Sequence, residues 1–481
     1  MKKITALFLA FCVAEGIVLF HGPYNATHAS VVKEPFQYDT MVDSRCEEDI
    51  DLEIVFKDTN LEADIRNAID KPTGTIIKSD LCNIKRLDLN NGKIIDITPL
   101  SNLTNLTELD LSYNQISDLT PLRNLTNLAC LYSECNQISD LTPLRNLTNL
   151  NELNLSDNKI SDISSLSNLS NLTTLNLYQN QIKDISPLSN LSNLTELNLR
   201  FNQIRDLAPL SDLINLTELD LFNNQISDLT PLNNLANLTK LNLVNNPLTD
   251  ITPLSNLKNL NDLNSSQSCT KINDLTPLCA LTNLVSLSLG NNEISDLTLL
   301  GSLTNLTNLG IFNNKISDLT PLSKLTNLTS LDSAYNQISN LTPISNLYNL
   351  TYLNLDCNEI SDISPLGKLT KLDQLYLDNN PIYNSSTPNA VHNSNLDFTV
   401  DGIIFEIWVI EVVFGDVNDD GKINTIDLAF MRKYLIGQIS EFPGGEKGLA
   451  AADVDKNGIF NSIDFGHMMN YLLGKGTIPP V

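Results

Sequence analysis

The sequence predicts an α/β solenoid, a curved array with parallel strands on its concave side and 3₁₀ turns on its convex side, followed by a small all-α module. Three observations predict this architecture. A 22-residue unit recurs about fourteen times over residues 81–382. Apolar and polar residues alternate over a few positions of each unit, as in a short strand with one buried face. Near the C-terminus, two similar acidic loops each precede an apolar, helix-like run.

Composition limits the classes of partner. The chain has 481 residues, 42% of them hydrophobic, a formal net charge of −26 and a pI near 4.4. Nucleic acids and anionic membrane surfaces are disfavoured partners, because both require a basic face. Calcium ions, a basic protein or a neutral glycan remain compatible. After the first residues, no segment has the ~20 apolar residues that a membrane-spanning helix needs.

Residues 1–29 are predicted to be a signal peptide. Lys2 and Lys3 precede an apolar run over 4–14, and small residues follow, with a candidate cleavage site before Ser30. The alternative is a lipid anchor on Cys12, but the bulky Phe11 fits that pattern poorly. We therefore expect a secreted, extracellular protein.

Residues 30–80 are predicted to form an N-terminal segment with a helical cap over 61–69. Such a cap is needed because a repeat array otherwise exposes its core at the first repeat. Two disulfides are considered: Cys46–Cys82, between cap and first repeat, and Cys269–Cys279, within one irregular unit. The alternative is that these cysteines are free thiols or small buried residues.

Each repeat reads L-x-x-L-x-L-x-x-N-x-I-x-D-[IL]-x-P-L. The asparagine lies within an apolar pattern, and a buried polar side chain must be hydrogen-bonded. We therefore predict a ladder in which each asparagine bonds the backbone of neighbouring turns. Its members are Asn114, Asn136, Asn158, Asn180, Asn202, Asn224, Asn246, Asn292, Asn314, Asn336, Asn358 and Asn380. A longer, 24-residue unit has Ser268 at this position, which predicts a local break.

The Thr-Pro-Leu or Ser-Pro-Leu segment of each unit limits extended helix and favours short 3₁₀ turns on the convex side. Together these motifs identify leucine-rich repeats, and the 22-residue form resembles the internalin-like bacterial repeats. Residues 56–82 resemble the cap that commonly precedes such repeats. The predicted repeat domain covers residues 81–382.

Residues that point outward from the strands should line the concave surface. Exposed aromatic rings among acidic side chains are typical of a recognition face for a protein or a glycan. The alternative is a solvated sheet surface that tolerates aromatic residues. The predicted face contains Glu108, Asp110, Tyr113, Tyr132, Glu134, Glu152, Asp157, Tyr178, Glu196, Arg200, Phe201, Glu218, Asp220, Phe222, Phe312, Asp332, Tyr335, Tyr352, Asp356, Tyr376 and Asp378.

Residues 383–413 are predicted to be a connector, polar over 383–402. The apolar stretch 405–414 is a candidate strand that caps the last repeat.

Two C-terminal loops have the oxygen-ligand spacing of EF-hand-like calcium sites. A hard cation needs several oxygens from one short loop, a glycine at position 6 and a backbone carbonyl at position 7. The first loop offers Asp416, Asn418, Asp420, Lys422, Asn424 and Asp427. The second offers Asp453, Asp455, Asn457, Ile459, Asn461 and Asp464. We therefore predict two bound Ca²⁺ ions.

Two such loops, each followed by an apolar run, resemble the type I-like dockerin module of cellulosome subunits, here predicted over residues 414–475. The resemblance implies calcium-dependent folding and binding to a cohesin module of a scaffold protein. It places the partner-binding positions at Thr425 and Ile426 in one half and at Ser462 and Ile463 in the other. Arg432 and Lys433 match the basic positions of the first helix.

The second helix departs from the dockerin pattern, because Met469 and Asn470 stand where the first helix has its basic pair. The first helix is therefore expected to make the electrostatic contacts with cohesin.

The sequence favours a non-catalytic, cellulosome-associated binding subunit without enzymatic activity. Two alternatives stay open: a glycoside hydrolase with a cryptic carboxylate pair, and a surface-adhesion component in which the repeats act as a spacer. Carboxylate spacing cannot identify a catalytic pair, because stacked repeats place many carboxylates at such distances. The four histidines, at 21, 28, 392 and 467, all lie outside the repeats.

Overall fold

The computed structural model describes residues 52–266 and 272–382, two short strands at 397–400 and 403–406, and the single helical positions 430, 431, 433 and 452. Within these residues, no helix is long and apolar enough to cross a membrane. The predicted signal peptide lies outside the described part of the chain, as does most of the predicted dockerin.

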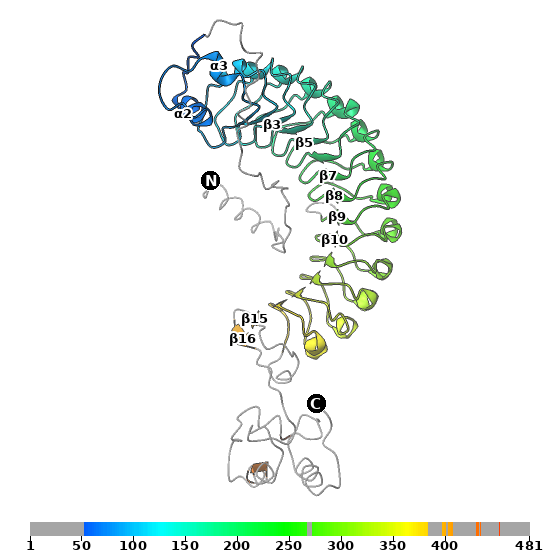
Figure 1. Ribbon diagram of the computed structural model, residues 1–481. Helices are drawn as coiled ribbons and strands as arrows, with labels where there is room; N and C mark the ends of the chain where they lie inside the picture. The colour runs from blue at the N-terminus through cyan, green and yellow to red at the C-terminus, as the bar shows by residue number, and fades with distance from the viewer. Residues whose placement is uncertain are drawn as a thin grey trace.

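Fourteen parallel strands form one open sheet in sequence order, as predicted. Figure 1 shows them along the inner side of an arc whose outer side carries the 3₁₀ turns. Neighbouring strands pair in register, so that Leu109, for example, lies opposite Leu131, 22 positions on. Across the longer unit the offset is 24, and Leu263 lies opposite Leu287. The strands are β1 (Arg86–Asp88), β2 (Glu108–Asp110), β3 (Cys130–Tyr132), β4 (Glu152–Asn154), β5 (Thr174–Asn176), β6 (Glu196–Asn198), β7 (Glu218–Asp220), β8 (Lys240–Asn242), β9 (Asp262–Asn264), β10 (Ser286–Ser288), β11 (Asn308–Gly310), β12 (Ser330–Asp332), β13 (Tyr352–Asn354) and β14 (Gln374–Tyr376).

Most convex turns begin with a hydrogen bond from a backbone N–H to an aspartate side chain. The sequence analysis predicted these turns from their proline and did not include this bond. In the turn Thr120–Leu122 the backbone N–H of Thr120 donates to Asp118 Oδ1 at 2.8 Å, and most other turns repeat this bond. The turns Ser164–Leu166 and Thr298–Ser302 lack proline and are 3₁₀ as well, so the Asp bond suffices to start the turn. The remaining turns are η2 (Thr98–Asn102), η4 (Thr142–Leu144), η6 (Ser186–Asn190), η7 (Ala208–Leu210), η8 (Thr230–Leu232), η9 (Thr252–Asn256), η10 (Thr276–Ala280), η12 (Thr320–Lys324), η13 (Thr342–Ile344) and η14 (Ser364–Lys368).

One continuous core runs the length of the array. In each turn the middle strand residue points inward, as Leu109 does, together with the leucines and isoleucine at the other consensus positions. These side chains are almost completely buried, so each repeat covers the apolar side of the next. At about 25 cal/mol per Å² of apolar surface, this burial is the main favourable contribution to folding.

The predicted asparagine ladder is confirmed. Asn202 accepts the backbone N–H of Ile182 at 3.0 Å, and its Nδ2 donates to Leu177 O at 3.0 Å, both in the preceding repeat. The same Nδ2 also lies within hydrogen-bond distance of Leu199 O and Arg200 O in its own turn. Each asparagine thus joins two adjacent repeats at the bend that leaves the strand.

The irregular unit changes the ladder beside it. Ser268, where the break is predicted, lies outside the described residues. The neighbouring repeat is described, and there the N–H of Leu248 donates to Asn246 O at 2.8 Å, whereas the matching Ile226 donates to a ladder asparagine. The ladder continues on the far side, where Asn292 Nδ2 reaches back to Ser265 O at 3.4 Å.

The helical cap lies where the sequence predicts it, as α2 (Thr59–Ala68) followed by the short α3 (Lys78–Leu81). Asp58 joins cap and array through four backbone N–H groups. Its side chain caps α2 at Asn60 and Leu61, and its Oδ2 accepts from Ile95 and Asp96 of the first repeat turn. Burial opposes the charge of this carboxyl, but these hydrogen bonds lower its pKa.

The two candidate disulfides have different outcomes. Cys82 is disulfide-bonded, and its predicted partner Cys46 lies outside the described residues. Cys279 is a free thiol, so the Cys269–Cys279 pair is wrong. Free thiols are also present at Cys130, Cys135 and Cys357.

The last repeat is followed by a hairpin. Strand β15 (Asp397–Val400) pairs antiparallel with β16 (Ile403–Glu406), and β15 lies beside β14. The predicted capping strand, 405–414, overlaps this hairpin only at its first two residues, and 407–414 lie outside the described part.

Replacing a ladder asparagine should destabilise the array more than replacing an exposed one. Asn202→Ala would leave the N–H of Ile182 without its acceptor. The carbonyls of Leu177 and Leu199 would each lose one of two side-chain donors, because Asn180 and Asn224 still reach them. The expected cost is about 2 kcal/mol. Asn127→Ala is the matched control, because Asn127 Nδ2 makes one exposed bond to Thr104 O and its loss should cost less than about 1 kcal/mol. The midpoint of urea unfolding measures both, and equal shifts would contradict the role assigned to the ladder.

Candidate functional site: the concave face

The concave face is built from three side-chain positions in each repeat. The first and third strand residues point away from the core, and so does the side chain two positions beyond the strand. In the sixth repeat these positions are Glu196, Asn198 and Arg200. The residue after them, Phe201, has a φ of 52° and turns the chain toward the ladder. Because the strands pair in register, each position forms a row across the sheet.

The residue that turns the chain toward the ladder has a left-handed backbone, and a bulky side chain there raises the conformational energy. Asparagine adopts positive φ readily and occupies this position in several repeats, including Asn223 and Asn245. Tyr113, Phe201 and Tyr335 adopt φ values of 58°, 52° and 55° there. Tyr113 and Tyr335 are also 47% and 50% exposed. Backbone strain together with an exposed ring makes these positions candidates for ligand contact.

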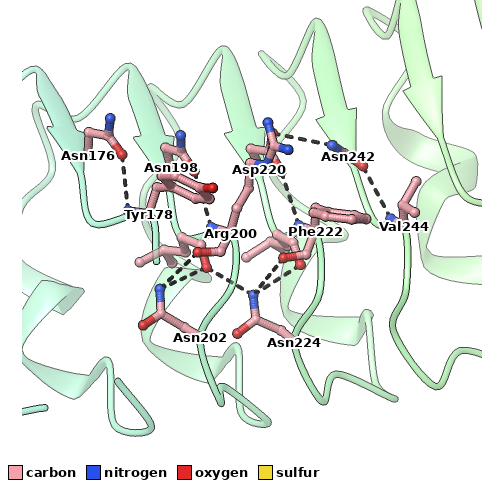
Figure 2. Close-up of polar contacts among 12 residues, drawn as sticks. Asn176, Tyr178, Asn198, Arg200, Asn202, Asp220, Phe222, Asn224, Asn242 and Val244 are labelled. Atoms are coloured by element: carbon pink, nitrogen blue, oxygen red, sulfur yellow. Dashed lines mark hydrogen bonds and ion pairs between the residues drawn. The ribbon is translucent and has the colours of Figure 1, made fainter. Parts of the chain in front are cut away.

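An aromatic cluster encloses an arginine at the centre of the face. Phe201 packs edge-to-face against Tyr178 and Phe222, with ring centroids 5.6 and 4.8 Å apart. The guanidinium of Arg200 lies 5.6 Å from the Tyr178 centroid and 5.1 Å from that of Phe222. Figure 2 shows Arg200 reaching between these two rings, above the ladder asparagines. Arg200 Nε is 3.6 Å from Asp220 Oδ2, an ion pair too long for a hydrogen bond.

Seven acidic side chains in the repeats of β2 to β7 divide into two groups. Three carboxylates have cationic partners on the face, in the pairs Arg86–Glu108, Arg200–Asp220 and Lys240–Glu218. Four have none among the residues that the structure describes: Glu134, Glu152, Asp157 and Glu196.

Neutral groups contact three of these four carboxylates. Glu134 accepts from Asn154 Nδ2, and Glu152 accepts from the Tyr132 hydroxyl at 2.6 Å. Asp157 accepts from Gln179 Nε2 at 2.8 Å and lies 3.4 Å from the Cys135 thiol. The pKa of the fourth, Glu196, is raised by burial and then by the charges of Glu218 and Glu152, while Lys240 opposes the shift.

The other end of the face contains tyrosines and strongly perturbed carboxyls. The rings of Tyr352 and Tyr376 lie 5.6 Å apart. Burial raises the pKa of Asp332 to about 7, against the opposing bond from the Ala334 N–H. Burial also raises the pKa of Asp356 to about 6, although the N–H of Asp378 donates to it at 2.7 Å.

Three members of the predicted face are not exposed. Asp110, Asp332 and Phe312 retain only 5%, 3% and 7% of their accessible surface. The two aspartates fold back, and each accepts the backbone N–H two residues on. Phe312 lies over Gly290, where an added Cβ would be 2.2 Å from its ring. Period-2 alternation predicts which side of the sheet a residue faces but not whether its neighbours cover it.

The predicted calcium ligands and cohesin-binding residues lie outside the described residues, with one exception. Lys433 is helical and exposed, and its Nζ lies 5.4 Å from the ring centroid of Phe430. Met431, between them in sequence, is buried. This is consistent with the amphipathic helix expected after the first loop.

Sequence comparison identifies both modules. A dockerin type I domain matches residues 414–473. Leucine-rich repeats match residues 104–146, 148–190, 192–234, 282–324, 326–368 and 348–389. No curated protein matches the chain.

Three solved structures resemble the array. An internalin (inlF) from Listeria monocytogenes is 39% identical, with a TM-score of 0.65, over 68% of this chain and 97% of the internalin. The functional domain of InlJ, also from Listeria monocytogenes, is 28% identical with a TM-score of 0.59, over 71% and 79% of the two chains. The leucine-rich-repeat protein LIC12759 from Leptospira interrogans is 26% identical with a TM-score of 0.58, over 63% and 86%.

A curved leucine-rich-repeat array with a dockerin defines a protein–protein interaction protein of the cellulosome type. Both matched modules are non-catalytic kinds. The chain belongs to the internalin-like leucine-rich-repeat proteins and carries a C-terminal dockerin type I domain.

Asp332→Asn should stabilise the array at neutral and alkaline pH. Because burial raises the folded-state pKa of Asp332 to about 7, its stabilising contribution is complete below the unfolded pKa and is lost as the pH rises toward 7. Each pH unit in that window costs about 1.4 kcal/mol, and an uncharged Asn avoids the cost. The melting temperature of Asp332→Asn should exceed that of the wild type at pH 8, and the difference should shrink at pH 4. An equal difference in melting temperature at pH 4 and pH 8 would contradict the raised pKa of Asp332.

Proposed function

We propose that this protein is a secreted, non-catalytic binding subunit of a cellulosome. In this proposal the dockerin binds a scaffold cohesin in a calcium-dependent manner, and the concave face of the repeats binds a protein or glycan ligand. The observation that carries the proposal is the presence, in one chain, of a dockerin type I domain and an internalin-like array with exposed aromatic residues on its concave face. The sequence pattern at residues 1–29 supports export.

Calcium fits the residues of the two loops. Type I dockerins are calcium-binding modules, and hard cations take carboxylate, amide and backbone carbonyl oxygens. In the proposed sites, Asp416, Asn418, Asp420, Asn424 and Asp427 contribute side chains, and Lys422 contributes its backbone carbonyl.

The second loop repeats this pattern, and we propose one Ca²⁺ ion in each loop. Asp453, Asp455, Asn457, Asn461 and Asp464 contribute side chains, and Ile459 contributes its backbone carbonyl.

We propose that cohesin contacts the first half of the dockerin through Thr425, Ile426, Arg432 and Lys433. The second half offers Ser462 and Ile463, with no basic pair on its helix. Lys433 is exposed, which suits this role, and a basic pair on an acidic protein can steer an oppositely charged partner.

Loss of the first ligand of both loops should abolish cohesin binding. Removing Asp416 and Asp453 together deletes one carboxylate from each calcium site, so the double change to Ala should reduce affinity for a cognate type I cohesin by at least about 100-fold. Titration calorimetry with and without EDTA measures the effect, and EDTA should reproduce it in the wild type. Unchanged affinity of the double variant for cohesin would contradict the docking proposal.

The enzymatic alternative makes a different prediction. A glycoside hydrolase would release reducing sugar from plant polysaccharides, and the purified full chain should release none above the buffer blank. Because the repeats contain no histidine, such activity would have to depend on carboxylates. Sustained release that a carboxylate-to-amide change in the concave face abolishes would overturn the non-catalytic assignment. The spacer alternative predicts that the repeats capture nothing specific from the culture medium.

A further inference from the structure

We propose that the repeats bind a basic polypeptide segment at an aromatic–acidic patch formed by Glu134, Glu152, Asp157, Tyr178, Glu196 and Phe201. Arginine or lysine side chains of the partner would lie against the rings and pair with the carboxylates. This inference rests on the proposed function, since it names the class of ligand that the concave face takes.

The first argument is charge. Among the residues described, Glu134, Glu152, Asp157 and Glu196 form no ion pair, although other carboxylates of the face do, and Lys240 only partly offsets the raised pKa of Glu196. The carboxylates of Glu152 and Glu196 lie on β4 and β6, separated by one strand, and close enough that Glu152 contributes to the raised pKa of Glu196. A bound cation relieves such repulsion. The chain's net charge of −26 also attracts a basic partner over a longer range.

The second argument is that this surface already holds a guanidinium. Arg200 lies within 5.6 Å of the Tyr178 centroid and 5.1 Å of the Phe222 centroid, so the rings accept a cation at their faces. Arg200 forms its ion pair with Asp220, at 3.6 Å, and with none of the four carboxylates of the patch. The patch therefore offers aromatic and anionic partners of the same kinds that Arg200 uses.

The third argument disfavours a glycan at this patch. A sugar stacks on an open, flat ring face, but Phe201 meets Tyr178 and Phe222 at interplanar angles of 78° and 74°. In each pair one ring presents its edge to the face of the other, so the cluster forms no flat platform. A neutral sugar also gains nothing from the net charge, whereas a basic segment does.

The fourth argument concerns the cost of the arrangement. Phe201 and Asp157 both adopt left-handed φ values, 52° and 51°, and a bulky ring in this region is strained. Asparagine would adopt that backbone more easily. The ring of Phe201 is nevertheless placed between two other rings at the centre of the face, where it can meet a ligand.

The test uses the full chain in calcium-containing buffer and a defined probe. The probe is a capped decapeptide of alternating arginine and glycine, and its citrulline counterpart has the same shape without charge. The wild type should bind the arginine peptide at 50 mM NaCl, with the citrulline peptide at least about tenfold weaker, and binding should weaken at 500 mM NaCl. The paired change Asp157→Asn and Glu196→Gln should weaken binding about fivefold to tenfold.

The matched control is Asp373→Asn with Glu359→Gln, which removes the same charges from exposed positions near the last repeats. It should change affinity less than about twofold. Equal weakening by the control, equal binding of the citrulline peptide, or no binding of the arginine peptide would each overturn the proposal. So would binding of cellohexaose, added as the glycan probe, that the patch variant weakens while the arginine peptide remains unbound.

Cohesin binding, measured on the same samples, separates this inference from the proposed docking function. A chain that binds cohesin but not the arginine peptide overturns the patch alone. If the chain binds the peptide at the patch but does not bind cohesin, the docking function is contradicted and the proposed peptide site is not.

Discussion

The asparagine ladder is the interaction on which the rest of the structure depends. A short strand must turn toward the convex side in every repeat, and that turn leaves backbone groups pointing into an apolar interior. Asn202 and its equivalents satisfy a donor and a carbonyl of the preceding repeat together with carbonyls of their own turn. Since an unpaired buried backbone group costs 1–3 kcal/mol, the leucine core could not close at this bend without the amide. The ladder therefore fixes both the length of each repeat and the register in which neighbouring repeats stack.

The dependence of the fold on this repeated interaction explains why most of the architecture could be predicted from the sequence. The strands, the convex turns and the ladder follow from a pattern repeated many times, so one interpretation applied to all repeats. A second ladder was missed, in which Asn127 and its equivalents donate to an exposed carbonyl of the preceding repeat. Its signal, an asparagine two positions after the first leucine of each unit, is present in the sequence. The Asp side chains that begin the 3₁₀ turns were also recurrent, and we assigned those turns to proline alone.

Properties that depend on a particular neighbour could not be predicted. Phe312 is buried because Gly290, one repeat earlier, leaves space for its ring, and that contact belongs to one pair only. Asp332 is buried with a pKa of about 7, while exposed aspartates at the convex turns, such as Asp140, have lowered pKa values. The free thiol of Cys279 shows the same limit, because spacing alone cannot establish that two cysteines meet. The candidate site was therefore predicted as a surface, whereas its charge pairing and ring geometry required coordinates.

The division between core and face also suits a weak, charge-based ligand site. Because the middle strand residue and the ladder carry the stability, the outward residues can bear strain and unpaired charge without loss of the fold. Contacts of this kind are screened by salt and are individually small. In the proposed function, a dockerin on the same chain would hold the repeats on a scaffold, where a partner on that scaffold has a high effective concentration. Under that condition a patch of modest affinity is sufficient, and its selectivity would come from charge and ring placement rather than from buried area.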